Sequence, residues 1–175
     1  LIMRDIELLK EVDKEAILPE DLKITLGQGA ILSVSLSSLD PIISQTLEPG
    51  GLPPLKRLQL LRQLKEEGFL AGVNAIPTLP FISDTEEELA KMIVSAKQHN
   101  ANYILVGGLT LFGNEAADSK TLYYKFLQRN RPELLPKYQV LYGNYSSPSQ
   151  AYQEQLRINS DKLCTMHQIR NRIIK

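Results

Sequence analysis

The sequence predicts an α/β protein with three parallel strands. Three short apolar segments, over 30–39, 70–76 and 102–109, are predicted strands, and amphipathic helical patterns alternate with them. About thirty to forty residues separate successive strands, which is too long for hairpins and typical of right-handed crossover connections. Periodicity alone does not separate part of a (β/α) barrel from an open doubly wound sheet.

Two helices are predicted in the first part of the chain. Apolar residues at helical spacing predict a helix over 4–16, with Asp5 as its candidate N-cap. Pro53 and Pro54 open a second helix with leucines on one face, and Gly68 is placed to end it. The strand over 30–39 lies between these helices, and the strand over 70–76 follows the second.

Three more helices are predicted after the second strand. The run Asp84-Thr85-Glu86-Glu87 resembles a capping box, in which the Asp84 carboxylate accepts the N3 amide. The helix that it starts ends near Asn100, a residue suited to a C-terminal cap. Helices over 120–128 and 150–172 complete the chain, on either side of a Pro- and Tyr-containing passage over 131–145.

The first predicted strand differs from a strand that is buried on both faces. Such strands are nearly continuous in Val, Ile and Leu, whereas this one alternates apolar residues with Ser33, Ser35 and Ser37. We expect the apolar side to face helices and the hydroxyls to face groups that hydrogen-bond, because an unpaired buried hydroxyl costs about 1–3 kcal/mol. The alternative is an edge strand whose serines face water.

Small and polar residues also occupy the carboxyl ends of the other two strands. Asn74 and Ile76 alternate with small apolar residues in the second strand, and Gly107 and Gly108 leave bare backbone near the end of the third. Ligands of α/β proteins bind at the carboxyl ends of parallel strands. These ends are therefore the candidate binding site.

Composition excludes several classes of protein. Among 175 residues, 20 Lys and Arg balance 20 Asp and Glu, so there is no basic surplus for a nucleic-acid partner. The single cysteine, Cys164, excludes an internal disulfide and an all-thiolate metal site built by this chain alone. No apolar run is long enough to span a membrane, and the first residues lack a signal-peptide pattern. We expect a cytoplasmic protein.

Several motifs resemble radical S-adenosylmethionine (SAM) proteins related to spore photoproduct lyase, and they occur in the order of that family. They are residues 1–6, the run from Val34 to Asp40, the run Leu47-Glu48-Pro49-Gly50 with Pro53 and Arg57-Leu58, the run from Gly72 to Pro80 with Asp84, and the stretch 132–144. Together these motifs cover most of the chain.

The resemblance implies that residues 1–130 are the C-terminal half of a partial (β/α)6 barrel and that residues 131–175 are a helical C-terminal extension. The family holds SAM against a [4Fe–4S] cluster, which cleaves it reductively to a 5′-deoxyadenosyl radical. Three cysteines spaced Cys-x3-Cys-x2-Cys bind that cluster, and this chain has no such motif. We therefore expect a chain that holds neither cofactor alone and is inactive alone. Its partner is the missing N-terminal half of the same protein, and its substrate is unknown.

The resemblance also implies which residues contact SAM, and hydroxyls and bare backbone suit a neutral nucleoside. The candidate SAM contacts are Ser35 and Ser37 in the first strand, Asn74, Ile76 and Pro77 in the second, and Gly108, Leu109 and Thr110 in the third. Glu48 and Arg57 belong to the family motif, and we expect them to fix the loop and the start of the second helix.

Two other functions stay open. A non-catalytic α/β module would complete its sheet by pairing with itself or with another chain through an exposed strand edge. A phosphate-binding enzyme would need a glycine-rich loop that leads into a helix, but Gly50 and Gly51 precede prolines, which lack the amides that a phosphate binds. We expect the tyrosines of the last third to pack the C-terminal extension; the alternative is that they line a substrate mouth.

Overall fold

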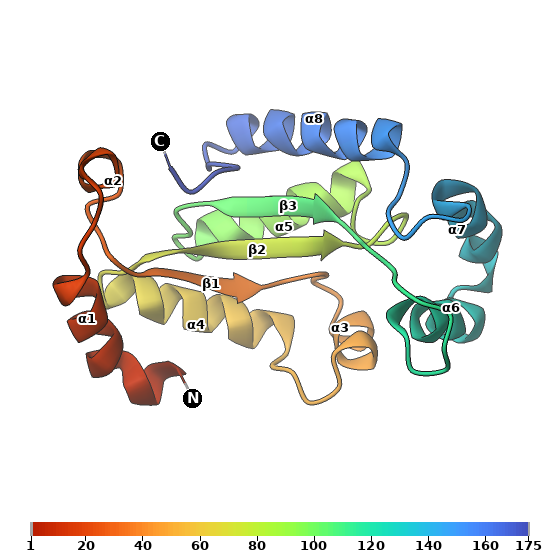
Figure 1. Ribbon diagram of the computed structural model, residues 1–175, viewed down its shortest axis with the longest axis horizontal. Helices are drawn as coiled ribbons and strands as arrows, with labels where there is room; N and C mark the ends of the chain where they lie inside the picture. Colours follow the sequence, from red (N-terminus) through yellow and green to blue (C-terminus); the bar gives the residue numbers. More distant parts are fainter. Residues whose placement is uncertain (1, 175) are drawn as a thin grey trace.

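The computed structural model describes residues 2–174 and has an α/β fold in which strands and helices alternate as predicted (Figure 1). Its strands are β1 (Ile31–Ser35), β2 (Leu70–Thr78) and β3 (Ile104–Gly108). Its α-helices are α1 (Ile6–Glu15), α2 (Glu20–Thr25), α3 (Pro41–Leu47), α4 (Pro54–Glu66), α5 (Glu86–Gln98), α6 (Ser119–Asn130), α7 (Leu135–Tyr142) and α8 (Gln150–Met166). Short 3-10 helices are η1 (Ile2–Asp5) and η2 (Pro132–Leu134). Leu1, in the motif over 1–6, and Lys175, at the end of the expected extension, lie outside the described residues.

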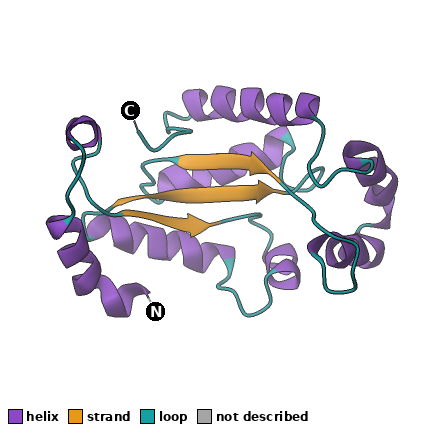
Figure 2. Cartoon of the chain, viewed as in Figure 1, coloured by secondary structure: helices purple, strands orange, loops and turns teal. Residues whose placement is uncertain are grey.

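The three strands form one parallel sheet in the order β1-β2-β3, which confirms the prediction from the strand intervals. Ser35 of β1 pairs in register with Asn74 of β2, and Asn74 pairs with Leu105 of β3. All three strands point the same way in Figure 2, so their carboxyl ends lie at one end of the sheet, beside α3 and α6.

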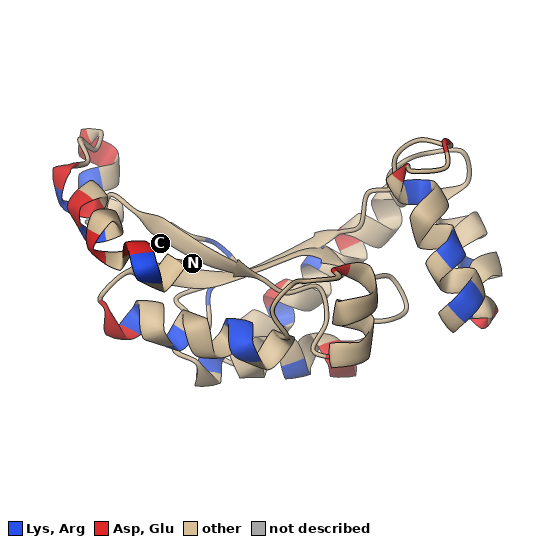
Figure 3. Cartoon of the chain, turned by 90° about the horizontal axis from the view of Figure 1, so that it is seen from below, with Lys and Arg blue, Asp and Glu red and all other residues tan. Residues whose placement is uncertain are grey.

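Helices α4, α5 and α8 cover one face of the sheet, as the view in Figure 3 shows. The apolar side of the strands, including Val34, Val73 and Ile104, packs in one core with the leucines of α4, Met92 of α5 and Leu163 of α8. The alternating pattern of the first predicted strand placed this apolar side against helices, and the structure confirms it. Burial of these side chains is the main source of stability in this layer.

The other face of the sheet carries no helix in the described chain (Figure 3). We call it the open face, and it is made by Ser33, Ser35, Asn74 and Ile76. Ser33, Ser35 and Ile76 are exposed there, and Asn74 is half-buried. Most parallel sheets are covered on both faces or closed into a barrel. Within the described residues, by contrast, helices cover this sheet on one face only.

The two edges of the sheet differ. The segment after α8 covers the edge of β3 that does not pair with β2. There the Ile104 amide donates to the Arg170 carbonyl at 2.9 Å, and Tyr103 forms a β-bridge with Arg170. Within residues 2–174, β1 pairs only with β2, so its outer edge keeps unpaired backbone groups. Unpaired strand edges favour association with further strands.

Several predicted element boundaries were wrong for identifiable reasons. β1 ends at Ser35 rather than at residue 39, because the chain turns into α3, whose N-cap Asp40 accepts from the Ile42 amide at 2.8 Å. Helix α8 ends at Met166 rather than at residue 172, because Gln168 takes a left-handed conformation and the chain then runs along β3. Helices α2, α3 and α7 were not predicted.

The predicted caps are partly confirmed. Gly68 has a φ of +95° just after α4, and Asn100 has a φ of +63° after α5, so both end helices as expected. Thr85, not Asp84, caps α5 by accepting from the Glu88 amide. The carboxylate of Asp5 pairs with Arg4 instead of capping α1. Within residues 2–174, no helix combines the length and apolar character needed to cross a membrane.

Candidate binding cavity at the carboxyl ends of the strands

A cavity of about 740 Å³ lies where the three strands end, and we call it the strand-end cavity. Residues that follow β1, β2 and β3 form one wall, and helices α3 and α6 form the others. A cavity of this volume is in the range that holds small organic ligands. The position agrees with the rule that α/β proteins bind ligands at the carboxyl ends of parallel strands.

Most of the candidate SAM contacts meet at this cavity. Its lining includes Ser35, Ser37, Ile76, Pro77, Leu109 and Thr110, whereas Asn74 and Gly108 do not line it. A β-carbon at Gly108 would instead meet Pro148, just before α8, at 3.5 Å and Tyr152 of α8 at 3.8 Å. Asn74 pairs in register with Ser35, which does line the cavity. The Oδ1 atom of Asn74 is buried without a hydrogen-bond partner among the described residues.

Each serine hydroxyl of the first predicted strand has a hydrogen-bond partner, as the cost of an unpaired hydroxyl requires. The Ser33 Oγ lies 2.7 Å from the Tyr103 hydroxyl, the Ser35 Oγ accepts from the Arg57 guanidinium at 3.0 Å, and the Ser37 hydroxyl donates to Glu48 at 3.3 Å. Within residues 2–174 nothing encloses Ser33 and Ser35, which are exposed on the open face of an edge strand, as the alternative prediction for this strand has it.

Arg57 joins the end of β1 to the loop before α4. Its guanidinium is buried and pairs with Glu48 at 2.5 Å. It also donates to the carbonyl of Leu52 at 2.6 Å and to the carbonyl of Ser35 at 3.1 Å. A planar guanidinium with several donors suits this position, because each acceptor lies in a different direction. These contacts are consistent with the loop-fixing role expected for Glu48 and Arg57.

Helix α6 forms a wall that the sequence reasoning did not assign to the site. Leu122, Lys125, Phe126 and Arg129 all line the cavity, and their spacing of three and four residues places them on one helix face. The sequence carried a signal for this wall, since α6 has no acidic residue and mixes cations with apolar side chains on that face.

Three tyrosines hold α6 and α7 against the strand-end loops. The Tyr138 hydroxyl donates to the Pro80 carbonyl at 2.7 Å, so it accepts the proton of Tyr123, whose oxygen lies 2.9 Å away. The Tyr142 hydroxyl donates to the Leu109 carbonyl at 2.7 Å, and its ring stacks on Tyr138. Burial raises the pKa of all three phenols, which keeps them neutral hydrogen-bond donors. Their main role is packing, as expected, although Tyr123 also lines the cavity.

Asp84 links the loop after β2 to helix α8. Its carboxylate accepts from the Phe81 amide at 2.6 Å and from the Tyr152 hydroxyl at 2.8 Å. Burial raises the pKa of the Asp84 carboxyl above its ordinary value of 3.8, against the opposing effect of these two donors. The folded state therefore favours the neutral carboxyl more than the unfolded state does.

We expect the Asp84→Asn variant to gain stability relative to wild type as pH rises. Because the pKa of Asp84 is raised in the folded state, its carboxyl adds to the free energy of unfolding when it is protonated. This stabilisation is fully present below the unfolded-state pKa and is lost as pH rises through the folded-state pKa. Asparagine does not titrate, and the Tyr152 hydroxyl can accept from its amide. Urea unfolding of both proteins between pH 3 and pH 8 measures the difference. A difference that stays constant over this range contradicts the assignment.

The described residues hold no metal-ligand cluster of three or more His, Cys, Asp and Glu side chains. Cys164 is 2% exposed in the core under α8, and burial raises the pKa of its thiol to about 12. It packs in that core as a small apolar residue. The residues of this chain do not fit an iron–sulfur cluster, whereas the hydroxyls and apolar side chains of the strand-end cavity fit a neutral nucleoside.

Comparisons with known proteins find relatives that are themselves described only as uncharacterized. A protein of Mycobacterium tuberculosis and one of Mycobacterium bovis are each 29% identical over 159 residues, which is 90% of this chain and 42% of the relative. A protein of Acidianus two-tailed virus is 31% identical over 80 residues, 46% of this chain and 22% of the relative. No family model and no solved structure matches. The chain thus spans less than half the length of the mycobacterial relatives.

Proposed function

We propose that this chain is the C-terminal half of a partial (β/α) barrel of the radical SAM class and that its strand-end cavity binds the nucleoside of SAM. The observation that carries the proposal is that residues in or just after three separate strands, chosen on their place at the strand ends and on the resemblance, line one cavity. When bound together, SAM and a [4Fe–4S] cluster supply reductive cleavage of the sulfonium. The ligands of that cluster must come from polypeptide outside this sequence.

In this proposal, the chain binds and orients the nucleoside. Ser37 and Thr110 offer hydroxyls to the ribose, and Ile76 and Leu109 offer apolar contact to the adenine. Arg57 holds Ser35 in place by bonding both its hydroxyl and its carbonyl. The buried Oδ1 of Asn74, which has no partner in the described chain, supports a polar group arriving on the open face.

The layering of the sheet supports the barrel. Among the described residues, helices cover one face only, and small and polar side chains lie on the other face, as on the inner wall of a barrel. The outer edge of β1 is free to pair with a further strand. The chain spans 42% of the length of the mycobacterial relatives, so those proteins are long enough to contain the remaining strands.

The test uses a longer polypeptide that contains this chain together with the coding sequence upstream of it. We expect a Cys-x3-Cys-x2-Cys motif in that sequence, a [4Fe–4S] cluster after anaerobic reconstitution, and release of 5′-deoxyadenosine from SAM on reduction. Ile76→Glu, at an exposed position that lines the cavity, should weaken SAM binding by about tenfold or more, because it places a charge against an apolar contact.

The matched control is Ile158→Glu on α8, where the isoleucine is 46% exposed against 48% for Ile76 and lies outside the cavity. This control should bind SAM as wild type does. The proposal is contradicted by an upstream sequence without the three cysteines, or by a reconstituted cluster protein that releases no 5′-deoxyadenosine.

The free edge of β1 favours a second candidate function, a non-catalytic module that completes its sheet by association. This candidate predicts a dimer of the 175-residue chain in sedimentation velocity experiments. It also predicts that Ser33→Pro, which removes a backbone donor and adds a ring in β1, reduces dimer formation. A chain that stays monomeric at all concentrations contradicts it.

A further inference from the structure

Two cations on helix α6 face the strand-end cavity without a partner. Lys125 and Arg129 lie one turn apart on α6, and both line the cavity. Neither side chain makes a hydrogen bond or ion pair with another of residues 2–174. Like charges at this spacing destabilise a helix slightly. The last turn favours Arg129 through the helix dipole, but Lys125 lies before that turn.

The remaining charge in the cavity is already neutralised. Glu48 is the one carboxylate in the described lining, and it is bonded to Arg57 and to the Ser37 hydroxyl. The cavity therefore carries a net positive charge at its α6 wall, although the whole chain is neutral. Figure 3 shows this local excess as blue bands on the helix at the right, where α6 lies in Figure 1.

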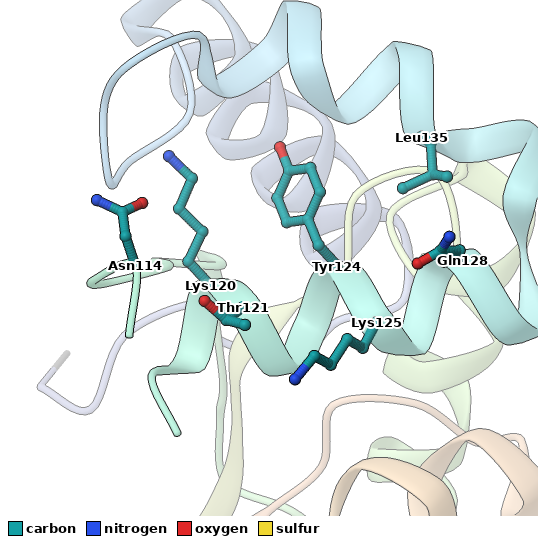
Figure 4. Close-up of a pocket in the computed structure, with 7 residues that line it drawn as sticks. All are labelled: Asn114, Lys120, Thr121, Tyr124, Lys125, Gln128 and Leu135. Carbon is teal, nitrogen blue, oxygen red and sulfur yellow. The ribbon is translucent and has the colours of Figure 1, made fainter. Parts of the chain in front are cut away.

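The cations of α6 do not all face the same hollow, because a second one lies on the other side of this helix. Figure 4 shows it lined by Lys120, Tyr124 and neighbouring residues, with a volume of about 490 Å³. Lys125 borders both hollows, but its side chain points to the opposite side of α6 from those of Lys120 and Tyr124. Lys120 does not line the strand-end cavity, so Lys125 and Arg129 form the cationic pair there.

Apolar side chains lie directly beside this pair. Leu122 and Phe126 come from the same face of α6, and Leu111 comes from the segment after β3. Leu122 is exposed, so it leaves apolar surface for a ligand to cover. Cationic groups next to apolar side chains are complementary to a molecule with an anionic end and an apolar body.

We propose that the α6 wall binds a small amphiphilic anion, with its carboxylate or phosphate held by Lys125 and Arg129 and its apolar part against Leu122 and Phe126. This inference rests on the proposed function, because it makes the anion the substrate class that lies beside the nucleoside. A cavity of about 740 Å³ is large enough for two small molecules.

The test is a titration of the 175-residue chain with octanoate, octyl phosphate and octanol, followed by the amide resonances of α6. We expect both anions to shift the Leu122 and Phe126 amides. Lys125→Ala combined with Arg129→Ala should weaken both by about tenfold, because charge-assisted hydrogen bonds are lost. Octanol should bind this variant as it binds wild type. The ratio of octanoate to octyl phosphate affinity distinguishes a carboxylate substrate from a phosphate substrate.

The matched control combines Lys56→Ala with Arg62→Ala, which removes the same two charges from exposed positions of α4 outside the cavity. It should bind both anions as wild type does. Equal anion affinity for wild type and the α6 variant overturns the inference, as does octanol binding as tightly as octanoate.

A parallel adenosine titration of the longer polypeptide, which contains this chain and the sequence upstream of it, separates this inference from the proposed function. If adenosine shifts the Ile76 and Leu109 amides and neither anion shifts α6, the anion site is wrong and the SAM assignment stands. If the anions bind with the expected dependence on Lys125 and Arg129 and adenosine does not bind, the anion site is upheld and the SAM assignment falls.

Discussion

The Arg57→Ala variant will be about 3 kcal/mol less stable than wild type. Arg57 is 8% exposed, and the loss of its guanidinium leaves the carbonyls of Ser35 and Leu52 without this donor. It also leaves the Glu48 carboxylate without its ion-pair partner. Removing one partner of a buried ion pair costs about 3–5 kcal/mol, and the lower end applies because Glu48 is partly exposed and stays hydrated.

Urea unfolding measures this effect, with Arg62→Ala as the control on the same helix. Arg62 is exposed and makes one hydrogen bond, to the Gln98 carbonyl, so its replacement should cost about 0.5 kcal/mol. Arg57→Lys keeps the charge but loses the divergent donors, so its stability should lie between those of wild type and Arg57→Ala. Equal effects of Arg57→Ala and Arg62→Ala would show that the Arg57 network contributes nothing to stability.

The Gly72→Ala variant will also be about 3 kcal/mol less stable than wild type. A β-carbon at Gly72 would lie 2.5 Å from the Tyr103 ring and 2.6 Å from the Tyr103 carbonyl oxygen. Tyr103 is fully buried, and its carbonyl accepts from the Val73 amide at 2.9 Å. The ring and the backbone can yield only if β2 and β3 separate locally, so the cost lies at the upper end of the range for overpacking.

Gly108→Ala is the matched control for this substitution. Gly108 is also a strand glycine, but a β-carbon there would meet only Pro148 at 3.5 Å and Tyr152 at 3.8 Å, which are ordinary contacts. Its unfolding free energy should stay within about 1 kcal/mol of wild type. Thermal and urea unfolding of both variants test the pair, and a Gly72→Ala protein as stable as Gly108→Ala contradicts the packing described here.

The arrangement of strands was predictable because it depends on local pattern and connection length. The intervals between the strand segments require parallel pairing, and the alternation of Ser33 and Ser35 with Val34 assigned the correct side to the helices. The same pattern did not decide whether the serine side is enclosed. That depends on whether other polypeptide covers the open face, which no local pattern records.

The site was predictable only where backbone position decides it. Residues at strand ends, such as Ser37, Pro77 and Thr110, must meet at one edge of a parallel sheet, and they line the cavity. Gly108 was assigned by the same logic, but a β-carbon there would meet Pro148 and Tyr152, because the extension packs there. Asp84 was assigned to a cap, but its carboxylate reaches Tyr152, sixty-eight residues away in sequence. Contacts of this length depend on tertiary packing.

The α6 wall was missed for a related reason. Lys125 and Arg129 are ordinary residues of an amphipathic helix, and their significance comes from the cavity that they face. The α7 tyrosines bond the Pro80 and Leu109 carbonyls, and Tyr123 of α6 bonds Tyr138; these contacts set that orientation. The absence of acidic residues in α6 was the one signal in the sequence.

The most direct measurement is an adenosine titration of the isotopically labelled longer polypeptide, which contains this chain and the sequence upstream of it, followed through the backbone amides by NMR. If the hollow at the strand ends receives the nucleoside, the largest shifts will occur at Ser37, Ile76 and Leu109–Leu111, and the amides of α1 and α2 will not move. Saturable shifts that map to another surface, or none at millimolar adenosine, would contradict the account.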